Sequence, residues 1–172
     1  MRILSAVLAI AVLVAGAAAA QDNAALTDVA VASNDGIRSY NAEDIPTYDI
    51  AADGTVDWPT FSGFRRYNAE CHVCHGPDGE GSTYAPALKD SVMRIDYYEF
   101  VGVVAGGKQD VNAAQNQVMP SFGANPNVMC YLDDIYTYLR ARGTDAVPRG
   151  RPAKRADKTD AYDAAEKTCM GF

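Results

Sequence analysis

The stretch Cys71-His72-Val73-Cys74-His75 carries the most specific signal in the chain. Two cysteines three positions apart, followed directly by a histidine, form the pattern of covalent c-type haem attachment, in which the thiols add to the haem vinyl groups. At the end of a helix this spacing lets the cysteines straddle one edge of the porphyrin and carries the histidine beneath the iron. We therefore expect one covalent haem c, attached through Cys71 and Cys74, with His75 as an axial iron ligand.

Two other kinds of site also use a pair of cysteines at this spacing. A thioredoxin-like redox site needs a surrounding βαβ pattern, which the flanking sequence lacks. A tetrahedral zinc site needs two further cysteine or histidine ligands at suitable spacing. Both stay open as alternatives, although the histidine directly after the pair and the export signal described below favour haem.

The second axial ligand is sought among the methionines. The chain has two histidines, and His72 lies inside the attachment loop, where the thioether bridges would direct it away from the iron. Beyond residue 20 the methionines are Met93, Met119, Met129 and Met170. Met119 is the best candidate because it lies in a loop 44 residues after His75, and Pro120 stiffens the backbone that presents its sulfur. Met93 is the second candidate.

A histidine and methionine pair suits haem iron to electron transfer. Thioether sulfur is a soft ligand that favours ferrous iron and a positive reduction potential. Two filled axial positions also disfavour the binding of oxygen or peroxide. A peroxidase-like enzyme, which we keep as an alternative, would need an open iron position and a distal acid–base residue. We therefore expect an electron-transfer protein with no catalytic residues.

Residues 1–20 have the pattern of a secretory signal peptide. Arg2 precedes an apolar stretch, and four alanines from Ala17 to Ala20 lead into the polar Gln21. Cleavage after Ala20 fits the small residues there, and an uncleaved membrane anchor is the alternative. No later segment is apolar enough to span a bilayer. The sequence thus predicts a periplasmic protein in an oxidising compartment.

The composition is that of an ordinary globular protein. The 172 residues are 48% hydrophobic and 22% charged, which excludes a wholly disordered, collagenous or multi-span membrane chain. The net charge of −7 argues against nucleic acid as a partner, because binding to phosphates needs a basic surface. The many carboxylates show no EF-hand-like spacing, so a calcium site has no support in the sequence.

Hydrophobic periodicity predicts short helices separated by loops. We expect helices over residues 59–71, from Tyr97 to the glycines at 106–107, and over 128–142 before Gly143, with loops over 76–90 and 108–127. Residues 21–57 contain eight acidic groups against one arginine and show no sustained period, so we expect a mostly irregular extension. Residues 140–158 hold seven basic side chains against two acidic ones. This basic run is either a solvated surface or a surface that steers a partner, and the acidic face could do the same.

Cys130 and Cys169 remain after the haem cysteines are assigned. Two cysteines that bind no cofactor in an oxidising compartment favour a disulfide between them, and two buried free thiols are the alternative. The bridge would close a 40-residue loop and stabilise the fold by about 4 kcal/mol in the chain-entropy model. It would also tie the basic tail to the last predicted helix. Without it, we expect residues 148–158 to be loosely held.

Several of these features together resemble the class I cytochromes c over residues 59–143. They are Gly63, Tyr67, the cysteine–histidine box, the turn from Ala85 to Leu88, Met119-Pro120 and the helix from Tyr131 to Leu139. The resemblance implies an all-α, single-domain fold whose first and last helices cross near Gly63. It also implies that the Pro86 carbonyl accepts the Nδ1 proton of His75 and so supports this ligand. The implied division is a signal peptide (1–20), an acidic extension (21–57), a cytochrome domain (58–143) and a basic tail (144–172).

A narrower resemblance rests on residues 63–88, on the Met-Pro-Ser-Phe-Gly loop at 119–123, and on Cys130 and Cys169 with a basic segment between them. These features are similar to those of the four-cysteine, methanol-metabolism-related c-type cytochromes, whose role is like that of cytochrome c-L. The resemblance implies a protein that accepts electrons from a quinoprotein (PQQ) methanol or alcohol dehydrogenase, including the lanthanide-dependent kind. It would pass them to a downstream cytochrome c or terminal oxidase. We expect a monomer, because a monomer suits such a shuttle. A generic respiratory carrier is the alternative.

Overall fold

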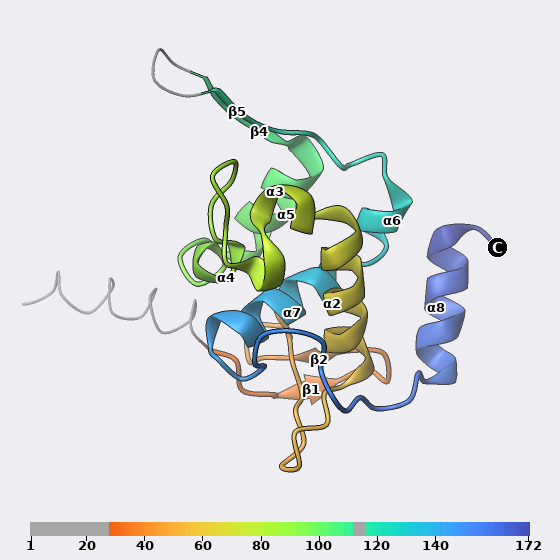
Figure 1. Cartoon of the computed structure of the whole chain (residues 1–172). Helices are drawn as coiled ribbons and strands as arrows, with labels where there is room; N and C mark the ends of the chain where they lie inside the picture. Colours follow the sequence, from red (N-terminus) through yellow and green to blue (C-terminus); the bar gives the residue numbers. More distant parts are fainter. Residues whose placement is uncertain (1–27, 112–115) are drawn as a thin grey trace, which may run out of the picture.

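A computed structural model describes residues 28–111 and 116–172, and it is mostly helical (Figure 1). The helices are α2 (Trp58–Glu70), α3 (His72–His75), the 3-10 turn η1 (Pro77–Gly79), α4 (Leu88–Ser91), α5 (Tyr97–Gly106), α6 (Pro126–Met129), α7 (Leu132–Gly143) and α8 (Asp160–Met170). The expected signal peptide lies outside the described residues. Within them, no helix combines the length and apolar character that crossing a membrane requires.

Helices α2 and α7 cross at the centre of the molecule (Figure 1). Asp57 caps α2 by accepting a hydrogen bond from the Thr60 backbone N–H, and Pro59 occupies the first turn, where its missing N–H costs nothing. At the crossing, a Cβ on Gly63 would lie 1.9 Å from the carbonyl oxygen of Asp134. Only glycine permits this backbone approach, so the expected crossing near Gly63 is confirmed.

The main core fills the space around this crossing. Fully buried side chains come from α2, α7 and the segment after α4, and they include Tyr67, Val92, Ile135, Tyr138 and Leu139. The rings of Tyr67 and Tyr138 lie 5.7 Å apart between the two helices. Apolar residues at helical spacing on α7 therefore face α2, as the sequence pattern predicts.

The helix expected over residues 128–142 is interrupted. Pro126 starts the short helix α6, and Tyr131 leaves helical geometry at φ −126° and ψ 16° before α7 begins at Leu132. Helix α2 and helix α5 agree with the predicted spans within one residue. The spacing of apolar residues over 128–142 predicts which face is buried, but it does not show that the helix is interrupted at Tyr131.

The described part of the acidic extension is mostly irregular, as expected, but it contains a small sheet. Three antiparallel two-residue strands, β1 (Ser33–Asn34), β2 (Ser39–Tyr40) and β3 (Pro46–Thr47), form a small sheet that packs on α7. Polar groups hold it: buried Asn41 accepts hydrogen bonds from two backbone N–H groups, and the Thr47 hydroxyl donates to the Val29 carbonyl. Such contacts leave no hydrophobic period in the sequence.

The expected loop over residues 108–127 contains a protruding hairpin (Figure 1). Strands β4 (Lys108–Val111) and β5 (Asn116–Met119) pair antiparallel, with Lys108 opposite Met119. Its described residues are mostly exposed, so backbone pairing rather than burial defines it. Together with β1–β3, this hairpin corrects the expectation of an all-α fold: the chain is mostly helical with short strands.

The C-terminal tail is attached at several places. Cys130 and Cys169 form a disulfide that joins the end of α6 to α8. The segment before α8 is held independently, because the Val56 N–H donates to the Lys154 carbonyl and the Ala156 N–H donates to the Val56 carbonyl. These bonds add to the disulfide, and the expectation that residues 148–158 are loosely held without it stays a prediction.

Candidate haem attachment site

The two cysteines of the attachment pattern lie where α2 ends and α3 begins. Cys71 terminates α2 and its backbone N–H donates to the Tyr67 carbonyl; the His75 N–H in turn donates to the Cys71 carbonyl. Both thiols are free, with Cys71 half-buried and Cys74 exposed. The single turn α3 thus carries both thiols and His75 on one short, hydrogen-bonded element.

The imidazole of His75 is buried and held from one side. Its Nδ1 lies 2.9 Å from the carbonyl oxygen of Pro86, the partner that the family resemblance implies. A carbonyl can only accept, so Nδ1 carries the proton and Nε2 keeps a free lone pair. Burial lowers the pKa of His75, which favours the neutral ring that a metal ligand requires.

The electrostatics around Cys71 differ from those of a redox-active cysteine pair. Burial raises the pKa of the Cys71 thiol to about 12, with the neighbouring Glu70 carboxylate adding to the effect. Reactive CxxC thiols have depressed pKa values, because nearby positive groups stabilise the thiolate. The environment therefore does not favour the thioredoxin-like alternative.

The hydroxyl of Tyr67 organises the backbone that follows His75. It donates to the Gly76 carbonyl at 2.6 Å and accepts from the Gly79 N–H at 3.1 Å. Tyr67 is fully buried, so these bonds are shielded from water. The four-residue spacing of Tyr67 and Cys71 predicts that they share a helix face, and this position explains why Tyr67 reaches the turn.

Glycine is required where the chain leaves α3. Gly76 has φ +72°, and a Cβ there would lie 2.1 Å from the carbonyl oxygen of Gly81. The Gly81 N–H donates to the His75 carbonyl at 2.8 Å, which closes the turn. The turn brings Pro86 back over the imidazole.

Two groups that sequence analysis missed anchor the same turn. Buried Arg142 on α7 donates to the Asp78 carbonyl and to the Glu80 carboxylate at 2.9 Å. The Asp78 carboxylate accepts from the Gly150 N–H at 2.9 Å and from Arg149 at 3.3 Å. These partners lie more than sixty positions away in the chain, so no local pattern could have revealed them.

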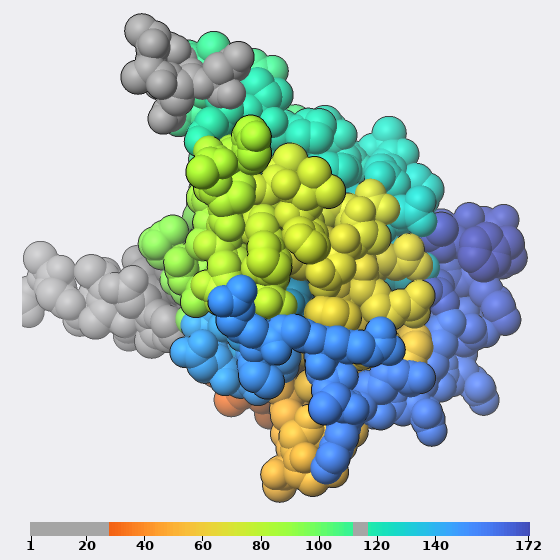
Figure 2. Space-filling model, in the orientation of Figure 1, coloured from red at the N-terminus to blue at the C-terminus, as the bar shows by residue number. Residues whose placement is uncertain are grey.

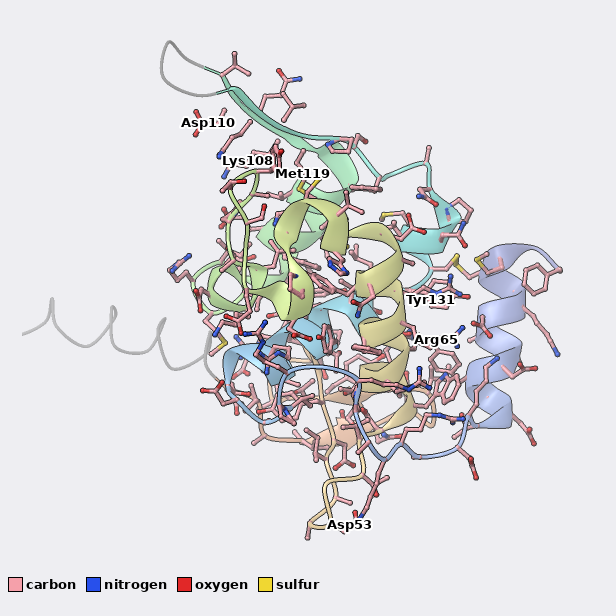
Figure 3. All side chains as sticks on the ribbon, in the orientation of Figure 1. Asp53, Arg65, Lys108, Asp110, Met119 and Tyr131 are labelled. Carbon is pink, nitrogen blue, oxygen red and sulfur yellow. A yellow bond between two sulfur atoms is a disulfide. The ribbon has the colours of Figure 1, made fainter. Side chains whose placement is uncertain are left out.

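Met119 lies at the end of β5, beside the body of the molecule (Figure 3). It is half-buried and packs against the same core cluster as Cys71. The following loop is fixed to α5, because the Phe122 and Gly123 N–H groups donate to the Val104 and Ala105 carbonyls. The thioether is therefore presented by a backbone anchored on both sides.

The other methionines occupy different surroundings. A Cβ on Gly143 would lie 3.0 Å from the Met93 sulfur, so Met93 packs against the end of α7. Met129 lines a cavity of about 270 Å³ beside the disulfide. Met170 is the last residue of α8. Met129 packs against the same core cluster as Met119, but it ends the short helix α6, whereas Met119 lies at the end of β5, just before the loop that is bonded to α5.

The residues present fit a covalently attached haem. Two free thiols, a buried imidazole with one free nitrogen and a half-buried thioether make the donor set. Other partly buried apolar side chains pack on the same core cluster as Cys71 and Met119, among them Leu88, Val101 and Phe122, and their exposed parts could contact a macrocycle. Within the described residues, no cluster of three or more histidine, cysteine or carboxylate side chains could hold a metal ion.

Comparisons with known proteins give two curated relatives and one solved structure, whereas no family model matches. Cytochrome c-553I of Paracoccus denitrificans is 68% identical over 133 residues, which is 77% of this chain but only 59% of that protein. Cytochrome c-555 of Methylococcus capsulatus is 37% identical over 100 residues, covering 58% of this chain and 75% of that one.

The solved structure is that of the c-type cytochrome XoxG from Methylobacterium extorquens AM1. It is similar to this chain at 50% sequence identity with a TM-score of 0.77, over 87% of this chain and 90% of that chain. The similarity therefore extends over sequence and fold together, well beyond the attachment pattern.

Proposed function

Since this chain belongs to the class I c-type cytochromes linked to methanol metabolism, we propose that it is a periplasmic, single-domain monohaem carrier of single electrons. Its donor is a PQQ-dependent methanol dehydrogenase, of the lanthanide-dependent kind, and its acceptor is a downstream cytochrome c or terminal oxidase. The observation that carries the proposal is the turn α3, with two free thiols and an imidazole oriented by Pro86.

In this proposal Cys71 and Cys74 attach the haem. Each S–H would add across one vinyl double bond of the haem, forming one C–S and one C–H bond with no need of an oxidant. The two thiols lie on one turn of helix, so a single rigid element positions both bonds. His75 supplies Nε2 to the iron, while the Pro86 carbonyl fixes the tautomer and the ring orientation.

Met119 would supply the second protein ligand to the iron through its thioether sulfur. When bound, haem iron supplies a reversible one-electron change between its ferric and ferrous states. The protein holds both ligands on anchored backbone: Tyr67 and Arg142 fix the segment after His75, and α5 fixes the loop after Met119. A site that keeps its geometry through both oxidation states suits a carrier that reacts quickly with its partners.

The N-terminal sequence and the disulfide support a location in the periplasm, where such a carrier would act. We propose that residues 1–20 are removed as a signal peptide and that the protein acts as a monomer in the periplasm. The disulfide between Cys130 and Cys169 supports an oxidising compartment. A shuttle between two partners also favours a small surface that binds and releases rapidly.

Stopped-flow mixing of the oxidised holoprotein with purified periplasmic methanol dehydrogenase and methanol tests the donor. We expect fast, saturable haem reduction that slows as salt is added, because charge guides such encounters. An unrelated class I cytochrome c provides the control. Reduction no faster than in that control would reject the methanol dehydrogenase and leave a generic respiratory carrier.

A further inference from the structure

The segment from residue 149 to residue 155, which we name the basic strap, runs across the start of α2 on the face seen in Figure 2. Its backbone is fixed by the Val56 N–H, which donates to the Lys154 carbonyl, and by the Gly150 N–H, which donates to Asp78. The strap is therefore an ordered part of the surface, although it has no regular secondary structure.

Two arginines of the strap lie over aromatic rings of α2. The guanidinium carbon of Arg151 is 4.9 Å from the centre of the Phe61 ring, and that of Arg155 is 4.9 Å from the Trp58 ring. Both side chains are exposed. Stacking restrains the planar guanidinium while its N–H donors stay available to a carboxylate from outside.

These two arginines are not neutralised within the part of the chain that the structure describes. Arg149 pairs with Asp78 at 3.3 Å and Lys154 pairs with Asp53 at 3.0 Å, whereas neither Arg151 nor Arg155 lies within ion-pair distance of a described carboxylate. The strap thus presents net positive charge on a chain whose total is −7.

Arg65 extends this positive surface along α2. It is exposed, lies one helical turn after Phe61 on the same face, and has no ion pair among residues 28–111 and 116–172 (Figure 3). From Arg65 the helix continues directly to Cys71. We call Arg65, Arg151 and Arg155 the arginine patch.

Helix α2 and the strap both connect the patch to the attachment segment. The strap is hydrogen-bonded to it through Asp78, which lies in the turn η1 directly after α3. A partner that binds the patch would therefore lie along α2, the helix whose end leads into the turn with the thiols and His75. Charge placed next to the redox group controls the orientation of encounter as well as its rate.

We propose that the arginine patch is a docking surface for the acidic face of a protein redox partner. The proposal rests on the proposed electron-transfer function and adds the partner's chemistry: carboxylates that pair with stacked guanidinium groups. The acidic remainder of the molecule repels the same partner elsewhere, so the patch orients the encounter. The contact is small and salt-sensitive, as a rapid exchange of electrons requires.

Charge reversal in the holoprotein tests the proposal. The variant carries Arg151→Glu and Arg155→Glu, and the matched control carries Arg94→Glu and Lys167→Glu, two exposed basic positions outside the patch with the same change in net charge. Oxidation of the reduced protein is followed at low salt with the trianion hexacyanoferrate(III) and with the trication cobalt(III) tris-phenanthroline. Poly-L-glutamate is added as an acidic polypeptide that competes for the patch.

We expect the patch variant to react with hexacyanoferrate(III) at least about threefold more slowly than the control variant, and with the cobalt complex faster. Poly-L-glutamate should slow the wild-type reaction and leave the patch variant unaffected. Equal rates for the two variants would overturn the proposal. These probes do not involve methanol dehydrogenase, so their result stands even if that donor is rejected.

An anionic membrane could also attract arginines, and one further measurement separates it from a protein partner. The oxidised holoprotein is sedimented with phosphatidylglycerol vesicles at physiological salt. We expect no binding, because three arginines without an apolar anchor give little membrane affinity. Binding of the wild type that the patch variant loses would assign the patch to the membrane and overturn the docking of a protein.

Discussion

A Cβ placed on Gly63 would lie 1.9 Å from the carbonyl oxygen of Asp134, so α2 and α7 meet backbone to backbone. The same methyl group would lie 2.8 Å from the Cβ of Tyr138. Helix α2 ends at Cys71 and α7 carries Arg142, which holds the turn after α3. The distance between the two helices therefore determines how the attachment segment is supported.

Replacing Gly63 with alanine is expected to destabilise the holoprotein by about 3 kcal/mol, because the helices must separate to admit the methyl group. Guanidinium unfolding measures the loss. Gly102 provides the control: it lies in α5, and a Cβ there would have no neighbour within 4 Å. Alanine at Gly102 should be neutral or stabilising by about 0.5–1 kcal/mol. Equal stabilities of the two variants would contradict the close crossing.

Replacing Met119 with alanine should abolish the sulfur-to-iron charge-transfer band of the ferric protein and lower its reduction potential, because a soft thioether stabilises ferrous iron. Met93→Ala is the matched control, since that sulfur packs against Gly143. Visible spectroscopy and a potentiometric titration measure both effects. Loss of the band in the Met93 variant, and not in the Met119 variant, would transfer the ligand role to Met93.

The candidate site could be found from sequence because its chemistry is local. The residues from Cys71 to His75 lie on one turn, and a fixed spacing of residue types specifies such a turn. Helix α5 was predictable for the same reason, since its apolar residues share one face. The supports of the site were not predictable: Arg142 and Gly150 reach Asp78 from more than sixty positions away.

Elements without an apolar period were also missed. Strands β4 and β5 are exposed and pair through backbone groups, so their sequence shows no alternation. Helix α8 buries one residue, Tyr162, whose hydroxyl bonds to Asp134 and Ser62, and it is also attached by the disulfide and by Glu166, which accepts a hydrogen bond from the Tyr131 hydroxyl. The sequence of the strap is also typical of a run of solvent-exposed charges. The aromatic rings that its arginines contact, Trp58 and Phe61, are remote in the chain, so the pattern does not show the stacking.

The denatured, unreduced holoprotein should contain no free thiol, because Cys71 and Cys74 are bound to haem and Cys130 is bonded to Cys169. Replacing both disulfide cysteines with serine is expected to cost up to about 4 kcal/mol in the free energy of unfolding. Thiol titration and guanidinium unfolding measure these outcomes. Two reactive thiols in the wild type would contradict the bridge.

The same double serine variant should be cleaved faster by trypsin at Lys167, at the end of α8 that the bridge attaches. Cleavage at Arg149 and Arg155 should not change, because the strap is held by Val56 and Asp78. Peptide mapping of short digests distinguishes the sites. Faster cleavage within the strap would show that the disulfide holds it after all.

Asp57 is expected to make stability depend on pH. Burial raises the pKa of Asp57 to about 6, and the nearby Asp49 carboxylate adds to the rise. The hydrogen bonds from Thr60 lower this pKa but only partly offset the burial. The folded state therefore binds the proton more tightly than the unfolded chain, whose pKa is 3.8. The stability contributed by protonation is complete below pH 3.8 and is lost as pH rises through about 6.

Asp57→Asn should remove this dependence, because asparagine caps a helix without a titratable charge. The variant is expected to be more stable than wild type at pH 7.5, by at most about 3 kcal/mol. The two proteins should converge as pH falls towards 4. Unfolding curves at several pH values measure the difference. A variant less stable than wild type at pH 7.5 would contradict this. It would show that the charged carboxylate stabilises α2 as a cap by more than its burial costs.

The measurement that tests the central claim most directly is the intact mass of the exported protein after denaturation without reduction. A covalent haem survives denaturation, whereas a noncovalent one is lost. The account predicts residues 21–172 plus the mass of one haem and minus two hydrogens for the disulfide, with tryptic fragments placing the haem on Cys71 and Cys74. A chain without added haem, or haem on another pair of cysteines, would contradict the account.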